Sequence, residues 1–260
     1  MMANTPESEQ KTGELTIVGH LVELRDRILK CLAALLLMFL ALVYFANDIY
    51  TFIATPLMSV LPPDTSMIAI DPTSPFFAPF KATFYASLFL CAPYILYQIW
   101  AFIAPGLYTN EKAMAIPLFV SSVVLFYAGI AFAYYVLFGF VFGFFVSIAP
   151  EGIAVAPDIS SYLSFVLKIF FAFGFVFEIP IAVYLLIWSG IVEVESLENK
   201  RPYVIVGCFV VGMLLTPPDP FTQTIMAVPM WMLYEVGVYA GKRMLKRKQA
   251  AEQKNTPVQN

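Results

Sequence analysis

Six stretches of apolar residues, separated by short polar connections, dominate the pattern of this chain. They cover residues 29–46, 80–103, 115–148, 162–191, 203–216 and 222–240. A helix needs about 20 mostly apolar residues to cross roughly 30 Å of hydrocarbon, and it satisfies its own backbone hydrogen bonds in lipid. The pattern therefore predicts an all-α integral membrane protein with six transmembrane helices and both termini on one side.

The last two stretches are unusual in length and in their connection. Residues 203–216 would extend only about 21 Å as a helix, which is short of the roughly 30 Å hydrocarbon core. Residues 222–240 contain Pro229, and the PPDP segment 217–220 imposes a rigid reversal between the two. We expect short fifth and sixth helices, with local thinning of the bilayer or a concavity shielded by protein.

Two segments flank the first stretch. Before it, apolar residues recur at helical spacing, which predicts an amphipathic helix lying on the inner face of the membrane. These residues are Ile17, Leu21, Leu24 and Ile28. Glu23 and Arg27 stand four residues apart on this helix and would form at least an exposed ion pair. After it, the proline-rich connection 47–79 is expected to be stiff and largely extended, with a short helix.

The distribution of charge fixes the orientation. Nearly all Lys and Arg residues lie before the first stretch, in the second and fourth connections and after the sixth, and the positive-inside rule places these segments in the cytoplasm. The chain is 60% hydrophobic and only 13% charged, unlike a soluble domain. We expect a polar segment 1–18, a single membrane domain 19–241 and a basic, disordered cytoplasmic tail 242–260.

The inventory of reactive side chains argues against an enzyme. His20 is the only histidine and lies on the predicted surface helix, so no buried histidine is available for an intramembrane protease or a histidine metal site. The chain also lacks a GxxxxGK[ST] phosphate loop. Its three cysteines, Cys31, Cys91 and Cys208, lie in or beside apolar stretches without a CxxC pair, as small core residues do. No metal, cofactor or nucleic acid is expected.

Glu178 is the most unusual polar residue, because it lies about 15 Å along the fourth helix from Trp188 at the cytoplasmic end. A charge near mid-membrane costs on the order of 2.5–3.5 kcal/mol, so such residues are functional candidates. A neutral carboxyl hydrogen-bonded within the bundle is the structural alternative. Lys168, earlier in the same stretch, is expected to extend toward the outer interface. A secondary transporter or ion channel that uses Glu178 is therefore one functional hypothesis.

Glu111 lies in the second connection, on a cytoplasmic face that is otherwise basic. Together with Glu23 it offers two carboxylates, and each carboxylate can take a guanidinium in bidentate geometry. The arrangement favours a cationic, arginine-bearing ligand.

Four segments resemble the signatures of one family. They are HLVELR at 20–25, QIWAFIAPGL at 98–107, FGFVFEIP at 173–180 and LLTPPD at 214–219. In this order, across residues 19–241, they are similar to the TatC family, the receptor core of the twin-arginine protein translocase. The resemblance implies a glove-shaped bundle of six helices in the bacterial cytoplasmic membrane. It also implies Sec-independent translocation of folded proteins, driven by the proton-motive force.

The resemblance further implies roles for particular residues. Glu23, Phe102 and Glu111, with Leu24, Arg25 and Leu107 beside them, correspond to the family's site for the arginine pair of the signal peptide. Glu178, Met213, Thr216 and Gln223 correspond to the docking surface for the single-span partners TatA and TatB. Pro56 and Asp219 correspond to external-side positions that the family needs for activity. Self-association within a larger complex is also expected.

Two positions depart from the family pattern. Lys168 stands where a small or apolar residue is expected, which puts partner packing at that level in doubt. Thr109 differs from relatives that carry a basic residue there, so the field around Glu111 is uncertain.

Overall fold

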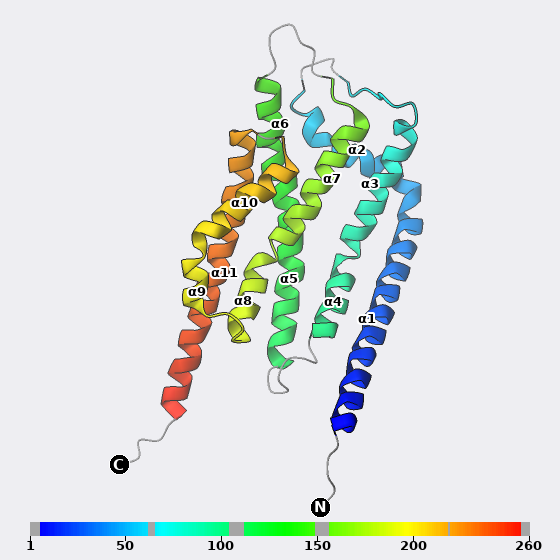
Figure 1. Ribbon diagram of the computed structural model, residues 1–260. Helices are drawn as coiled ribbons and strands as arrows, with labels where there is room; N and C mark the ends of the chain where they lie inside the picture. The colour runs from blue at the N-terminus through cyan, green and yellow to red at the C-terminus, as the bar shows by residue number, and fades with distance from the viewer. Residues whose placement is uncertain (1–5, 62–65, 104–111, 149–155, 218, 256–260) are drawn as a thin grey trace, which may run out of the picture.

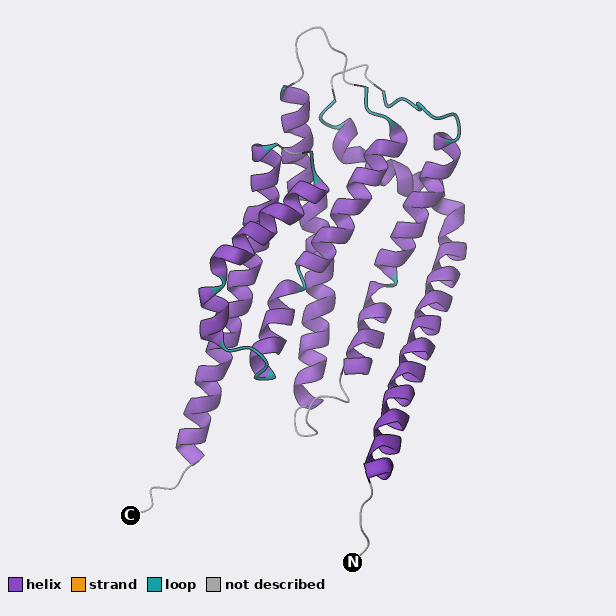
Figure 2. Cartoon of the chain, viewed as in Figure 1, coloured by secondary structure: helices purple, strands orange, loops and turns teal. Residues whose placement is uncertain are grey.

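The computed structural model describes residues 6–61, 66–103, 112–148, 156–217 and 219–255. In these ranges the regular elements are helices (Figure 1; Figure 2). They are α1 (Pro6–Leu42), η1 (Val43–Phe45), α2 (Ala46–Met58), α3 (Ser74–Leu90), α4 (Ala92–Ile103), α5 (Lys112–Phe132), η3 (Ala133–Leu137), α6 (Phe138–Ser147), α7 (Ile159–Val176), α8 (Ile179–Trp188), α9 (Val194–Asn199), α10 (Arg201–Leu215) and α11 (Pro220–Asn255). The predicted all-α class is confirmed.

Several of these helices are apolar and long enough to cross a membrane. Within the described ranges, three helical stretches qualify: Gly19–Met58, Ile116–Ser147 and Ile159–Trp188. The helices Ser74–Leu90 and Ala92–Phe102 make a fourth if the pair is one span bent by 47°. The predicted short fifth stretch corresponds to the shorter apolar helix Arg201–Leu215. The predicted short sixth helix is wrong, because residues 222–240 belong to α11, which continues without a break to Asn255, and residues 242–255 of the tail expected to be disordered are helical. The chain is therefore a multi-pass membrane protein.

The amphipathic helix predicted to lie on the membrane face does not exist as a separate element. Residues 17–28 belong to α1, which continues without a break from Pro6 to Leu42. After Pro6 this segment contains no proline, so its backbone hydrogen-bond ladder is not interrupted. Leu32, Leu36 and Leu40 are 55%, 58% and 60% exposed. This apolar stripe at helical spacing suits contact with lipid.

Proline explains two of the bends in the bundle. Pro93 lies at the start of α4, directly after the 47° bend from α3, and Pro180 lies in the first turn of α8, after the break from α7. A proline fits the first turn because the amide it lacks has no partner there. Pro117 and Pro229 lie inside the continuous helices α5 and α11. A separate π-helical turn, Ala133–Leu137, joins α5 to α6.

The main hydrophobic core surrounds α7. Its side chains Leu163, Phe170 and Phe173 are almost fully buried, as are Leu137 of the π-helical turn and Phe138, the first residue of α6. The rings of Phe138 and Phe170 lie 5.2 Å apart. Because α7 is surrounded on several sides, it forms the centre on which the flanking helices pack.

A second, smaller core joins α8 to α11. Val183 and Ile187 of α8 are buried against Tyr234 and Val238 of α11. The two helices approach closely at Gly237, where an added Cβ would lie 2.9 Å from Pro180 Cα. The second half of the fourth predicted span, α8, is therefore held mainly by the last helix.

The connections at one end of the bundle are tied together. Ile68 donates its backbone N–H to Pro157 (3.0 Å), and Ile159 donates its own to Ile68 (2.9 Å). The Asp158 carboxylate accepts the backbone N–H groups of Ser161 and Ile70. The predicted short helix in the first connection is α2. At the opposite end α1 begins and α11 ends (Figure 1).

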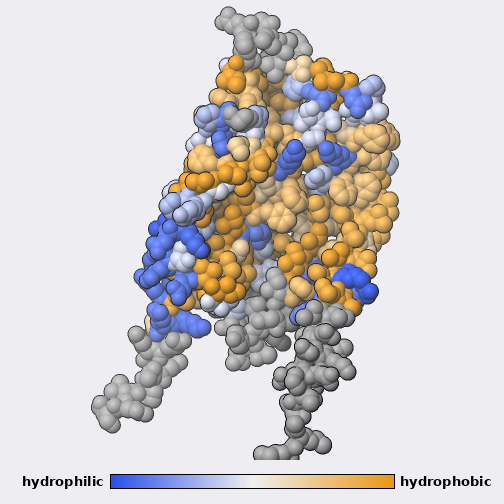
Figure 3. Space-filling view, viewed as in Figure 1, coloured by the Kyte–Doolittle hydropathy of each residue, from blue (hydrophilic) through white to orange (hydrophobic). Residues whose placement is uncertain are grey.

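Hydrophobic side chains cover the middle of the face shown in Figure 3. Hydrophilic side chains gather on that face over α9 and the second half of α11 (Figure 3). This separation is the one expected for a bundle whose middle faces lipid and whose ends face water.

Candidate functional site

Glu23 lies in a hydrogen-bonded cluster that joins α1 to α4. The Arg27 guanidinium donates to Glu23 Oε1 through Nε (3.0 Å) and Nη2 (2.5 Å). It also donates to Gln98 Oε1 (3.0 Å) and to the carbonyl oxygen of Ala101 (3.1 Å). Gln98 is buried, and the Arg27 side chain is only 21% exposed. The pair predicted to be at least an exposed ion pair is therefore partly buried and links two helices.

The second oxygen of Glu23 lies near His20 and receives no hydrogen bond from Arg27. Oε2 lies 3.8 Å from Nδ1 of His20, and the Glu23 side chain is 36% exposed. The His20 ring contacts the edge of Phe102 at a centroid distance of 5.7 Å. The structure thus brings together Glu23 and Phe102, two of the predicted signal-peptide residues, where the end of α4 lies beside the middle of α1.

An apolar groove begins at this cluster and follows the α1–α4 interface. Its volume is about 570 Å³. The lining residues are Leu24, Arg27, Ile28, Cys31, Leu32, Leu35, Leu88, Ile95, Gln98, Ile99 and Phe102. A charged head that continues into a long apolar groove fits an extended or helical segment with a basic start and an apolar continuation.

Of the four remaining predicted residues of this site, one lines the groove, one is paired elsewhere and two are not described. Leu24 lines the groove and is 38% exposed. Arg25 points elsewhere, since it donates to Asp26 from Nε (3.0 Å) and from Nη2 (2.8 Å). Leu107 and Glu111 lie outside the described residues.

Glu178 occupies the break between α7 and α8. Ser122 of α5 donates its hydroxyl to Glu178 Oε2. Glu178 Oε1 is buried, and no hydrogen bond reaches it from the described residues. At this break the Glu178 carboxylate points into the bundle, and its Oε1 remains available to accept a hydrogen bond.

The other predicted partner-docking residues lie where α10 meets α11. Met213 is 48% exposed, whereas Thr216 is buried and donates its hydroxyl to the carbonyl oxygen of Gly212 (3.0 Å). Gln223 donates from Nε2 to the carbonyl oxygen of Phe209 (2.8 Å). Thr216 and Gln223 therefore stabilise the α10–α11 turn, and Met213 is the member of the set that faces outward.

Asp219 caps the N-terminus of α11. Its Oδ1 accepts the backbone N–H of Thr222 (2.8 Å), and its Oδ2 accepts the Thr222 hydroxyl. An N-cap carboxylate satisfies a helical N–H that lacks an intrahelical partner. Pro56, the other predicted external-side residue, lies inside α2 and is half-buried.

Gln98 and Ser122 are site residues that the sequence analysis missed. Both are polar residues within apolar stretches, a signal that points to a functional or interhelical role. Arg201 is a third: it forms a bidentate pair with Glu235, through Nε (2.7 Å) and Nη2 (2.8 Å), that holds α10 to α11. Among the described residues, no group of three or more His, Cys, Asp or Glu side chains could hold a metal ion.

Comparison with protein families gives a match over most of the chain. Residues 19–229 match the family model described as TatC, Sec-independent protein translocase protein. The matched range contains the Glu23–Arg27–Gln98 cluster, the groove and Glu178.

Individual relatives and solved structures agree with this match. The chain is 58% identical over 250 residues to the Sec-independent protein translocase protein TatC of Azotobacter chroococcum, covering 96% of this chain and 97% of the relative. It is 57% identical over 223 residues to TatC of Escherichia coli K12, covering 86% of each. A crystal structure of the twin-arginine translocase receptor TatC superposes with a TM-score of 0.77 at 36% identity, covering 86% of this chain and 98% of that one.

Proposed function

The chain belongs to the TatC family of Sec-independent protein translocase proteins, and we propose that it is the receptor that binds twin-arginine signal peptides at Glu23. Its function is Sec-independent protein translocation. The proposal adds a bacterial cytoplasmic membrane, six spans with both termini in the cytoplasm, and a glove-shaped bundle. In this arrangement α10 and the first half of α11 are the fifth and sixth spans.

One observation carries the proposal: Glu23 already holds a guanidinium. Arg27 donates twice to Oε1 and once each to Gln98 Oε1 and to the carbonyl oxygen of Ala101. Oε2 receives neither of these bonds and lies 3.8 Å from His20 Nδ1. A second guanidinium, from a signal peptide, would bind at Oε2, and Glu111 of the nearby connection would supply the carboxylate for the other arginine of the pair.

The groove supports the same ligand. A signal peptide has a basic start followed by an apolar stretch. Its arginines would lie at Glu23 and Phe102, and its apolar stretch would lie against Ile28, Leu32 and Ile99 in the groove between α1 and α4. Burial of apolar side chains in this groove would contribute affinity without reading the peptide's sequence.

The docking of TatA-type and TatB-type partners is a second part of the proposal. An apolar stripe at helical spacing runs along the exposed side of α10. Its members Tyr203, Val206, Val210 and Met213 are 79%, 61%, 46% and 48% exposed. A single-span helix placed along this stripe would reach Met213, close to the α10–α11 turn that Thr216 and Gln223 stabilise. Glu178 would offer its open oxygen to a polar group of a partner.

Energy for transport would come from the proton-motive force, as membership of the TatC family implies; the sequence itself contains no phosphate loop for a nucleotide. The alternative hypothesis, a transporter or channel that uses Glu178, predicts flux of ions or solutes by this protein alone in liposomes. Family membership favours the translocase.

The test compares two carboxylates on the same helix. Glu23→Gln removes the carboxylate that the proposal uses, and Asp26→Asn removes the neighbouring exposed carboxylate paired with Arg25. Binding of a labelled twin-arginine peptide to the purified protein is measured for both variants, with a twin-lysine peptide as the ligand control.

We expect Glu23→Gln to weaken twin-arginine binding by about 2 kcal/mol, near the lower end of the range for a desolvated charge pair because Glu23 is partly exposed. Asp26→Asn should change it by less than about 0.5 kcal/mol. A photocrosslinker at Phe102 should label the twin-arginine peptide and not the twin-lysine peptide. Equal affinity in wild type and Glu23→Gln would remove Glu23 from the site.

A further inference from the structure

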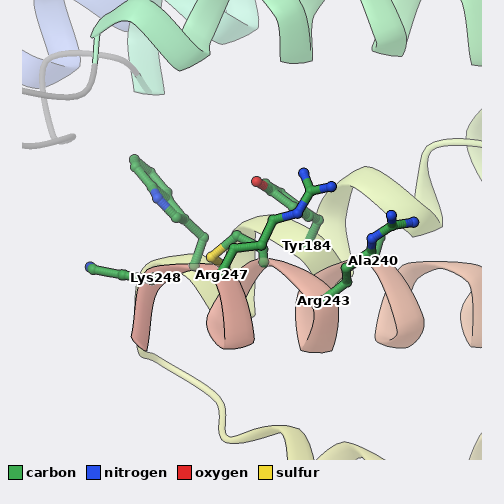
Figure 4. A pocket seen from close by; sticks show the side chains of 7 residues that line it. Tyr184, Ala240, Arg243, Arg247 and Lys248 are labelled. Atoms are coloured by element: carbon green, nitrogen blue, oxygen red, sulfur yellow. The ribbon is translucent and has the colours of Figure 1, made fainter. Parts of the chain in front are cut away.

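A basic pocket lies where α8 and α11 run side by side, apart from the α1–α4 site. Its volume is about 620 Å³, within the roughly 300–1,000 Å³ of small-molecule sites. The lining residues are Tyr184, Trp188, Ala240, Arg243, Met244, Arg247 and Lys248 (Figure 4). None of these described lining residues is acidic, so the pocket carries a positive potential.

Helical spacing accounts for the arrangement of the side chains. Arg243 and Arg247 are four residues apart on α11 and share a face. In Figure 4 both extend to the side on which Tyr184 lies, and Lys248 extends away along the helix. Tyr184 and Trp188 are likewise four residues apart on α8. The pocket therefore combines two guanidinium groups with two amphipathic rings.

The charges of this pocket differ from those of the basic residues around it. Lys242 donates to Glu198 (2.9 Å) and is thereby neutralised, and Arg201 is paired with Glu235 (2.7 Å). No ion pair of Arg243, Arg247 or Lys248 occurs in the part of the chain that the structure describes. Like charges at positions i and i+4 of a helix repel each other, so an anion between the guanidinium groups would relieve this repulsion.

We propose that this pocket binds the phosphate of an anionic phospholipid of the inner leaflet. Arg243 and Arg247 would donate to the phosphate oxygens, since a guanidinium matches phosphate in bidentate geometry. Basic pockets between helices at the cytoplasmic side of a membrane are typical sites for anionic lipid head groups. The placement rests on the proposed orientation, in which α11 ends in the cytoplasm.

The aromatic and apolar side chains around the pocket favour a lipid over free phosphate. Tyr and Trp concentrate at the level of the lipid head groups, where one part of the ring is wet and the other apolar. One and two turns before Arg243 on the same face of α11, Tyr239 and Val236 are 67% and 56% exposed and provide an apolar surface for acyl chains. Inorganic phosphate has no apolar part that could bury this surface.

The experiment measures lipid retention by the full chain. Detergent-purified protein is titrated with dioleoylphosphatidylglycerol or with dioleoylphosphatidylcholine, and bound lipid is counted by native mass spectrometry. Competition by inorganic phosphate distinguishes a headgroup site from a free-anion site. The test variant is Arg243→Gln/Arg247→Gln. The matched control, Lys242→Gln/Lys246→Gln, removes the same charge from the same helix outside the pocket lining.

We expect wild type and the control to retain the anionic lipid in preference to the zwitterionic one, and the test variant to bind it roughly 30-fold more weakly, which corresponds to about 1 kcal/mol for each basic side chain. Equal losses in both double variants would overturn the site, because net charge alone would then explain them. Full competition by millimolar phosphate, or equal retention of the two lipids by wild type, would overturn the lipid assignment.

The readout is independent of the proposed receptor function. It uses no signal peptide, and Glu23→Gln should bind lipid like wild type. Loss of peptide binding with intact lipid binding, or the reverse, therefore tells which of the two proposals has failed.

Discussion

Gly237 is the point at which a single methyl group should separate two helices. The added Cβ of Gly237→Ala would lie 2.9 Å from Pro180 Cα, 3.1 Å from the Pro180 carbonyl oxygen and 3.0 Å from Val183 Cβ. The first two are backbone atoms, which cannot rotate away. Either α8 or α11 must therefore shift, and the buried contacts of Val183 and Tyr234 shift with it.

The magnitude follows from two opposing effects. Overpacking a tight contact costs typically 1–3 kcal/mol, while replacing glycine by alanine inside a helix gains about 0.5–1 kcal/mol. The net expectation for Gly237→Ala is a loss of about 1 kcal/mol, the difference between the midpoints of the two ranges. The matched control is Gly207→Ala in α10, where an added Cβ meets nothing within 4 Å. There only the helical gain remains.

The assay is thermal unfolding of both variants and wild type in one detergent at one scan rate. We expect the apparent midpoint of Gly237→Ala to fall below wild type and that of Gly207→Ala to equal or exceed it. If Gly237→Ala were as stable as Gly207→Ala, the close approach of α8 to α11 would be wrong.

Three further predictions concern polar contacts. Asp219→Ala removes the cap from Thr222 and should lower stability by about 0.5–2 kcal/mol, measured by thermal unfolding against Asp219→Asn, which keeps a capping oxygen. Hydrogen bonds from backbone N–H groups, that of Ser161 foremost, lower the pKa of Asp158. The stability that the Asp158 carboxylate contributes is therefore complete above the unfolded pKa of about 3.9 and is lost as pH falls through the lower folded pKa. Unfolding of Asp158→Asn should depend less on pH than that of wild type in this acidic range, and an unchanged dependence would refute the role of the Asp158 hydrogen bonds. Arg201→Met breaks the bidentate pair with its partner on α11 and should lower the apparent midpoint at low salt, with a smaller difference from wild type at high salt; a difference independent of salt would indicate lost packing instead.

The sequence predicted the helices of the bundle better than their ends. Long apolar stretches without charge allow few structures in lipid other than helices, so the first four stretches and the short α10 appear as expected. The continuation of α1 through residues 17–28 was not predicted. Amphipathic spacing is the same whether a helix lies on a membrane or extends beyond it, so periodicity could not distinguish the two.

The candidate site, too, was predicted in part from the sequence and is in part visible only in the structure. Glu23 and Phe102 were predicted from their segments, and the structure brings them together through His20, where the end of α4 lies beside the middle of α1. Gln98 and its bond to Arg27 were not predicted, because the two residues are far apart in the chain and only the packing of α4 on α1 makes them neighbours.

The sequence by itself determined the all-helical membrane class, the family and the residue types available for an arginine-bearing ligand, because composition, periodicity and motif order are properties of the chain. Only the tertiary structure decided that Arg27 already occupies one oxygen of Glu23, that Ser122 reaches Glu178, and that Arg243 and Arg247 share a pocket with the rings of α8. Each of these depends on angles and distances between helices, which side-chain packing sets and a linear pattern does not contain.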